Sequence, residues 1–385
     1  MVLQDNLSQA LPAYFDASDL SIDAFDALCS QETRAEDYPG AIAVEQNIPI
    51  FSGDELRNMD RDAVLRTLNI ALRGPGVLAI KRGYTDTAVI DRMTEVFRAI
   101  VDDEKSDDAK GDHFGSNERI WNAIQKTFLR APGVSVDYYA NPLLALACEA
   151  WLGPSYRITA QMNNVKPGNK AQSVHRDYHL GFQSTDVVSQ FPAHTQVMSQ
   201  YLTLQGAIAH VDMPLEMGPT LLLPYSHQYQ PGYIAYTRPE FAEYFAGKRS
   251  QIPFEKGDMV FFSPALFHGA GNNTTENDRL ANLVQISSAF GRTMETLDNR
   301  AMTEAAYPVL LERVKAGTID ETAVDNAIAT VADGYSFPTN LDTDPPIGGN
   351  APETEQALVR RALDARMSLN DLRAELDART AKRRA

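Results

Sequence analysis

Cysteine is scarce in this chain: Cys29 and Cys148 are the only two among 385 residues, and they lie far apart. Two isolated cysteines supply neither a disulfide framework nor the paired thiolates of a zinc site. Long apolar runs are also missing, since no stretch approaches the roughly 20 apolar residues of a membrane helix. We therefore expect no membrane partner. Because the first residues lack the basic and then apolar layout of a signal peptide, we expect a cytoplasmic protein.

Positive charge is the next shortage. The chain has 35 Lys and Arg against 51 Asp and Glu, which gives a formal net charge of −16. This charge repels a phosphate backbone unless basic residues gather on one face, and here they are mostly scattered. The one concentrated basic stretch, at 382–384, is typical of a solvated helix end. We expect no nucleic-acid partner.

Helical signals dominate the beginning of the chain. Ser52 followed by Glu55 indicates a helix cap, and Gly74-Pro75-Gly76 ends that helical region. The apolar stretch 77–80 predicts the first core strand. Apolar residues then recur at helical spacing over 90–100, which predicts an amphipathic helix packed on a sheet.

The sequence pattern changes between about 156 and 290, where short runs of strand-forming residues alternate with Gly, Pro and Asn. This spacing predicts an antiparallel sandwich or barrel. Helical patterns return after 291, and Ser368 with Asp371 caps a final helix. We predict three segments, with a mainly β core flanked by helices, and the terminal helices are candidates for a lid, scaffolding or a homodimer contact. The segments are an N-terminal helical extension (1–74), a β core (75–290) and a C-terminal helical extension (291–385).

The pair His175 and Asp177 carries the first chemical signal. Residues two apart on a strand point to the same face, so an imidazole nitrogen and a carboxylate oxygen face one metal. A lone His-x-Asp triplet is more often a surface pair, however. His268, 93 residues later, supplies a third ligand from a different strand. Two histidines and one carboxylate form the facial triad of non-haem iron oxygenases. The alternative for His268 alone is a core histidine beside a glycine turn.

Arg279 adds a second signal. It opens the strand-like run RLANLVQIS, where alternation places it on one face with Ala281 and Leu283. An arginine directed into a barrel is costly without a partner, and the distal carboxylate of 2-oxoglutarate fits that need. The alternative is a salt bridge to Asp278 or Glu276.

In this order and spacing, His175-x-Asp177, the segment GPTLLLPYSH at 218–227, His268 and Arg279 resemble the phytanoyl-CoA dioxygenase family of Fe(II)/2-oxoglutarate oxygenases. The resemblance covers roughly residues 75–290. It implies a double-stranded β-helix, the jelly-roll or cupin-like barrel, with Fe(II) at one mouth held by His175, Asp177 and His268. It also implies 2-oxoglutarate and O2 as co-substrates.

Further residues are candidates for the lining of the site. Similarity to the family suggests that the strand face with Met162, Asn164 and Lys166 borders 2-oxoglutarate, and Gln172 is another candidate. Substrate contact is expected from five residues near the triad: Tyr178, His179, Phe182, Gln196 and Met198. The remaining histidines, His113, His194, His210 and His227, have no ligand spacing and are interpreted as structural or surface residues.

The resemblance implies hydroxylation of a small organic substrate with release of succinate and carbon dioxide. The carboxylate of Asp177 leaves no halide position beside the metal, so hydroxylation is favoured over halogenation. The segment 181–198 has no Lys or Arg, which favours a free small molecule over a coenzyme A thioester. Two alternatives stay open: a non-catalytic binding protein that keeps the jelly roll, and a cupin-type metalloenzyme that does not use 2-oxoglutarate.

Overall fold

The computed structural model describes residues 11–106 and 117–384. Its centre is a mixed sheet of eight strands in the order β1-β2-β3-β8-β6-β10-β5-β4. Strands β2 and β3 run parallel, and the other neighbouring pairs are antiparallel. The bounds are β1 Ala41–Glu45, β2 Ile48–Ser52, β3 Val77–Lys81, β4 Glu118–Ile120, β5 Arg157–Val165, β6 Thr203–Ala209, β8 Met259–Phe262 and β10 Arg279–Ser287.

A second, smaller sheet faces the first. Its strands β7 (Leu221–Leu222) and β9 (His268–Gly269) pair antiparallel, and backbone bridges to His175 and Ser250 extend it. One hydrophobic cluster joins Leu222 of this small sheet to β2, β3 and β8 of the large one. The two sheets therefore enclose an interior between them.

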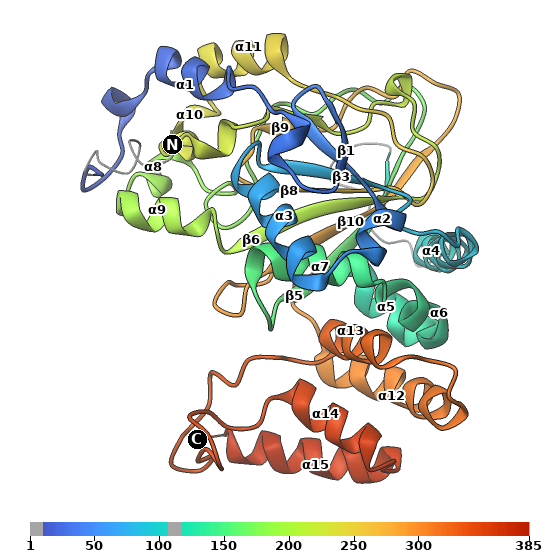
Figure 1. The fold of residues 1–385 in the computed structure, drawn as a ribbon. Coiled ribbons are helices and arrows are strands. Elements are labelled where there is room, and N and C mark those ends of the chain that lie inside the picture. The colour runs from blue at the N-terminus through green and yellow to red at the C-terminus, as the bar shows by residue number, and fades with distance from the viewer. Residues whose placement is uncertain (1–10, 107–116, 385) are drawn as a thin grey trace.

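Helices cover the opposite face of the large sheet. Alternation along β3 places Leu78 and Ile80 in a cluster with these helices, while Val77 and Ala79 face the small sheet. Figure 1 shows the C-terminal helices α12 to α15 stacked beyond this layer, at the bottom of the view. The layer and stack comprise α3 Arg61–Arg73, α4 Ala88–Ser106, α5 Ala123–Arg130, α6 Pro132–Tyr139, α7 Pro142–Leu152, α12 Asn299–Ala316, α13 Glu321–Val331, α14 Glu355–Asp364 and α15 Leu369–Lys382.

Short helices surround the small sheet at the other end of the molecule (Figure 1). They pack through two clusters rich in aromatic residues, one of which is centred on Phe25. The remaining elements are α1 Ile22–Cys29, α2 Gly53–Asn58, α8 Thr185–Val188, α9 Ala193–Ser199, α10 Gly232–Ala235 and α11 Pro239–Lys248, with 3-10 turns η1 Ala17–Asp19, η2 Ala35–Asp37, η3 Leu215–Met217 and η4 Ser226–Gln228.

Several local predictions are confirmed. The Ser52 hydroxyl accepts from the Glu55 backbone at the start of α2, and Ser368 and Asp371 form the capping box of α15. Helix α4 is present, and the chain after 291 is helical apart from its connecting loops. Within the described residues, every helix is too short or too polar to span a bilayer.

The description of residues 1–74 as a helical extension needs correction. Strands β1 and β2 lie in this segment and join the edge of the large sheet, so β3 is the third strand and not the first. The turn between them, Gln46-Asn47, has φ of 50° and 66°, the left-handed pair that a tight hairpin requires. The division at residues 75 and 290, and a homodimer through the terminal helices, stay predictions.

Candidate metal centre

His175 and His268 are brought together by the small sheet. The His175 amide donates to the His268 carbonyl at 3.0 Å, and the His268 amide donates back at 3.1 Å. Two residues on, the Asp177 amide donates to the Pro264 carbonyl at 3.0 Å. The segment leading to Asp177 therefore runs antiparallel to the segment ending in His268, and residues two apart share a face.

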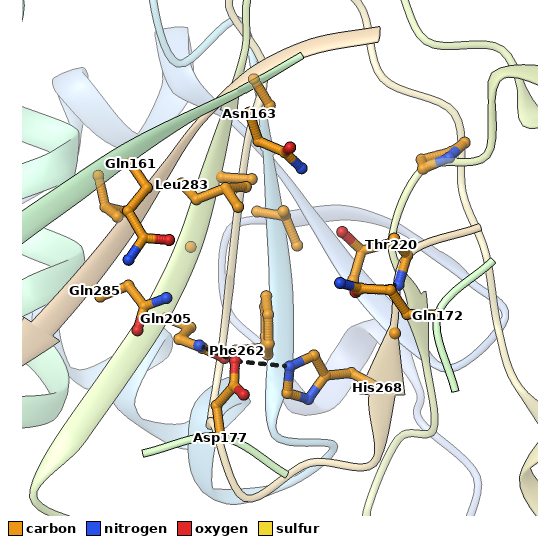
Figure 2. A pocket seen from close by; sticks show the side chains of 18 of the residues that line it. Gln161, Asn163, Gln172, Asp177, Gln205, Thr220, Phe262, His268, Leu283 and Gln285 are labelled. Atoms are coloured by element: carbon orange, nitrogen blue, oxygen red, sulfur yellow. Dashed lines mark hydrogen bonds and ion pairs between the residues drawn. The ribbon is translucent and has the colours of Figure 1, made fainter. Parts of the chain in front are cut away.

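The three side chains converge on one point. Asp177 lies 3.7 Å from His175 (Oδ1 to Nε2) and 3.4 Å from His268 (Oδ2 to Nε2). One ligand atom from each residue lies within 4.8 Å of the others, and this is the one such group found in residues 11–106 and 117–384. Figure 2 shows Asp177 and His268 facing each other at the base of a cavity. The donor set fits a divalent first-row metal.

Hydrogen bonds fix the tautomer of both histidines. His175 Nδ1 lies 2.9 Å from the Ser173 carbonyl, and His268 Nδ1 lies 2.7 Å from the Leu266 carbonyl. A carbonyl oxygen only accepts, so each Nδ1 is the donor and each Nε2 keeps its lone pair toward Asp177. This is the arrangement by which proteins orient histidine ligands.

The electrostatics of the group suit a cation. Burial alone raises the pKa of Asp177, but the neighbouring imidazoles of His268 and His175 and the amide of Gln205 hold that pKa well below its usual range. Burial and repulsion from His268 lower the pKa of His175. Asp177 is therefore ionised and His175 neutral at neutral pH, which are the forms that bind metal. The Gln205 amide Nε2 donates to Asp177 Oδ2 at 2.6 Å and orients the carboxylate.

The triad opens into a cavity of about 520 Å³ between the two sheets. Strands β5, β6, β8 and β10 form one wall, and residues 172–177 with β9 form the other. Phe262 packs edge-on against the His268 ring at 4.9 Å and forms part of the apolar lining.

Arg279 also lines this cavity, with 6% of its surface exposed. Its Nη1 donates to the Met217 carbonyl at 3.4 Å, and within the described chain it has no carboxylate within ion-pair distance. Asp278, an alternative partner, pairs instead with Lys166 at 2.7 Å, and Glu276 is exposed. Burial lowers the pKa of Arg279 to about 10, so the guanidinium stays charged at neutral pH. A buried cation beside an open cavity is a site for an anionic ligand.

The model of the phytanoyl-CoA dioxygenase family matches residues 72–281. The chain belongs to this family. The match covers all four motif residues and confirms the resemblance drawn from their order and spacing.

Solved structures similar to this family member include three proteins of low sequence identity. SnoN, a non-haem α-ketoglutarate-dependent epimerase of nogalamycin biosynthesis, is 20% identical with a TM-score of 0.44, and the match covers 59% of this chain and 84% of SnoN. SnoK, a carbocyclase of the same biosynthesis, is 20% identical with a TM-score of 0.44 over 63% of this chain and 90% of SnoK. HygX from Streptomyces hygroscopicus, solved with nickel and 2-oxoglutarate bound, is 16% identical with a TM-score of 0.44 over 59% and 88%. No curated protein matches the chain.

Three of the residues predicted to border 2-oxoglutarate lie elsewhere in this family member. Met162 and Asn164 line a separate cavity on the helical side of β5, together with Lys166. Their neighbours Gln161 and Asn163 face the metal centre instead. The prediction of which β5 residues face the metal centre was therefore wrong by one residue. Because side chains alternate along a strand, a shift of one residue places them on the opposite face of the sheet. Gln172 does line the cavity, where its Oε1 accepts from the Ala270 amide at 3.1 Å.

Of the five predicted substrate contacts, Phe182 lines the cavity. Tyr178 and His179 have φ of 62° and 37°, so the chain leaves the extended form directly after Asp177 and Tyr178 is buried elsewhere. Gln196 lies in α9 and donates to the Val188 and Phe191 carbonyls, while Met198 on the same helix is exposed. Neither of these two lines the cavity.

Sequence reasoning missed a group of polar residues on the inner face of the large sheet. They are Gln161 and Asn163 on β5, Gln205 on β6 and Gln285 on β10. Gln285 could have been predicted from the sequence, because it continues the alternation of Arg279, Ala281 and Leu283.

The other histidines take no part in the site, as far as they are described. His210 lies between Thr94 and Tyr138 in the helical core, and His227 is buried against Gly76. His194 is exposed, and His113 lies outside the described residues.

Proposed function

We propose that this protein is an Fe(II)/2-oxoglutarate-dependent dioxygenase that hydroxylates a small organic molecule. One observation carries the proposal: two Nε2 atoms and one carboxylate converge at a cavity whose lining also holds a buried arginine with no carboxylate partner among the described residues. A metal triad alone fits many metalloenzymes. The added cation supplies what a dicarboxylate co-substrate needs at its far end.

His175, Asp177 and His268 would hold the iron. With 2-oxoglutarate and O2, bound iron supplies the oxidising chemistry that releases succinate and carbon dioxide and hydroxylates a C–H bond. Three protein ligands leave three of six positions for small molecules. We also propose that the two facing sheets are the walls of a double-stranded β-helix, which is the finer form of the fold described above.

The side chains of the protein have distinct tasks in this proposal. The carbonyls of Ser173 and Leu266 keep each histidine in its ligating tautomer, and Gln205 holds the Asp177 carboxylate in place. Arg279 binds the distal carboxylate of 2-oxoglutarate and orients it toward the triad. Apolar lining such as Phe262 excludes water around these charges, which strengthens each contact.

The test is 2-oxoglutarate-dependent succinate formation and oxygen uptake by the iron-loaded protein. We expect His268→Ala and Asp177→Ala to abolish both and to lower the bound iron, because each removes one of three ligands. His194→Ala is the matched control, since this exposed histidine does not line the cavity. If His268→Ala kept normal iron content and turnover, the proposal would be wrong. Metal binding without succinate would favour a cupin-type enzyme or a binding protein.

A further inference from the structure

Four carboxamide side chains form a row on the cavity face of the large sheet, which we call the amide row: Gln205, Gln285, Gln161 and Asn163. Gln205 and Gln285 are direct cross-strand partners on β6 and β10. On the next strand, Gln161 pairs with Leu283 and Asn163 with Ala281, so the row runs diagonally across β5. Figure 2 shows Gln205, Gln285 and Gln161 on one side of the cavity and Asn163 at its far end, across from Thr220 and Gln172. The row begins at the metal centre, because Gln205 contacts Asp177.

The amide row has hydrogen-bonding capacity that the described protein does not use. Each of its four residues is at least nine-tenths buried. The oxygens Gln205 Oε1, Gln285 Oε1 and Asn163 Oδ1 are buried and have no partner within the described residues. Buried polar atoms are normally paired, so carboxamide groups that line a cavity and keep an unsatisfied oxygen are candidates to bond a ligand there. Three acceptors on one wall call for a ligand that presents several O–H or N–H donors.

The chemistry of the wall favours an uncharged ligand. An amide offers an acceptor and a donor but no net charge, which matches a hydroxyl group that also does both. A cationic ligand would meet Arg119, whose Nη1 lies 3.3 Å from Gln161 Oε1. Two more arginines line the cavity: Arg176 is fully buried and already donates to the Ser226 and Tyr229 carbonyls, and Arg279 is assigned to 2-oxoglutarate in the proposed function. With Arg176 and Arg279 engaged in this way, Arg119 by itself does not make a basic cluster for a polyphosphate in the described cavity lining.

A hydrocarbon chain fits the amide row poorly. It would offer the three oxygens no donor and leave them buried without a partner, which is unfavourable. The mouth of the cavity adds a complementary feature, because the rings of Trp121 and Phe182 line it and remain partly exposed. Aromatic faces pack against the C–H surface of a saturated ring, while its hydroxyl groups bond to amides.

We propose that the amide row binds the hydroxyl groups of a neutral polyhydroxylated ring, so that the organic substrate belongs to the glycoside or cyclitol class and not to the acyl thioesters. This inference rests on the proposed oxygenase function, because it takes the cavity beside the metal as the substrate site. Gln285 and Asn163 are its specificity-determining residues, because each keeps an unsatisfied oxygen, whereas Gln205 is already bonded to Asp177.

The experiment is isothermal titration calorimetry under anaerobic conditions, with and without Fe(II) and 2-oxoglutarate. The probes are methyl β-D-glucopyranoside and myo-inositol, with octanoate and octanoyl-coenzyme A as comparators. We expect at least one polyol to bind at millimolar concentration. Gln285→Leu and, independently, Asn163→Leu should weaken it at least about tenfold, as expected when a buried hydrogen bond to a ligand is lost. Gln190→Leu is the matched control, because Gln190 is exposed and outside the cavity lining. Thermal melts check that each variant is folded.

Two results would overturn the inference. One is no binding by either polyol to the wild type. The other is binding of octanoate or octanoyl-coenzyme A that Gln285→Leu leaves unchanged or improves. Failure of the proposed function has a different signature, because a polyol would then bind the protein while 2-oxoglutarate gave no succinate.

Discussion

Arg279 offers a demanding test of how the cavity works. Its guanidinium is 6% exposed and has one long contact, 3.4 Å to the Met217 carbonyl. If it makes two charge-assisted hydrogen bonds to the distal carboxylate of 2-oxoglutarate, their loss in Arg279→Ala costs about 2–4 kcal/mol. That loss corresponds to a dissociation constant for 2-oxoglutarate that is roughly 30- to 700-fold larger. Iron binding should change little, because Arg279 contacts none of the three triad residues.

The assay is an anaerobic titration of the iron-loaded protein with 2-oxoglutarate, with iron content measured in parallel. A second readout uses stability. Without 2-oxoglutarate the buried charge of Arg279 has no carboxylate partner in the part of the chain that is described, so Arg279→Leu should leave the melting temperature unchanged or raise it. Added 2-oxoglutarate should then stabilise the wild type and not the variant. An unaltered dissociation constant in Arg279→Ala, or clear destabilisation of the unliganded Arg279→Leu, would show that this arginine is structural.

Three further predictions concern residues around the site and the core. Gln205→Leu removes the 2.6 Å hydrogen bond to Asp177, so the affinity for iron, measured by chelator competition, should fall about 10- to 100-fold. An affinity equal to that of the wild type would exclude an orienting role for Gln205. Gly232→Ala would place a Cβ 1.9 Å from Arg176 Cζ, so denaturant unfolding should show a loss of about 1–3 kcal/mol, and normal stability would contradict this packing. Burial lowers the pKa of His210 to about 3, below its value in the unfolded chain. Below about pH 6.5 the unfolded chain therefore binds more protons than the folded one, and the free energy of unfolding falls as the pH drops toward 3. The free energy of unfolding should fall by up to about 1.4 kcal/mol per pH unit. His210→Gln should reduce this slope when the free energy of unfolding is measured against pH.

The convergence of the triad was predictable because it depends on short-range geometry. The spacing of His175 and Asp177 requires only an extended backbone, and that prediction is confirmed by the bridge to His268. The inward position of Arg279 followed from the same alternation on β10. Metal binding by these residues stays a prediction.

Which alternate residues of β5 face the cavity, the phase of this strand, was not predictable in the same way. Eight of its nine residues are buried, so both faces are shielded and hydrophobicity does not distinguish them. The pairing of Gln161 with Leu283 defines the phase, and that pairing joins residues more than a hundred positions apart. For the same reason the amide row was not visible in the sequence, because its members come from three strands that only the fold brings together.

Local exceptions to regular geometry explain the other misses. Tyr178 and His179 were expected in the site because they follow Asp177 in the sequence, but their left-handed backbone turns the chain directly after Asp177. Gln196 and Met198 lie on a helix, where residues two apart diverge by about 200° and do not share a face. The strands at 41–52 are visible in the sequence as two apolar runs around Gln46-Asn47, which are followed directly by the helix cap at Ser52.

The most direct test of the central claim is a crystal structure of the protein prepared anaerobically with Fe(II) and 2-oxoglutarate. We predict a metal bonded to His175 Nε2, His268 Nε2 and the Asp177 carboxylate, with 2-oxoglutarate on the metal and its distal carboxylate paired with Arg279. A metal bound elsewhere, or a fully loaded triad with Arg279 turned away from the co-substrate, would contradict the account.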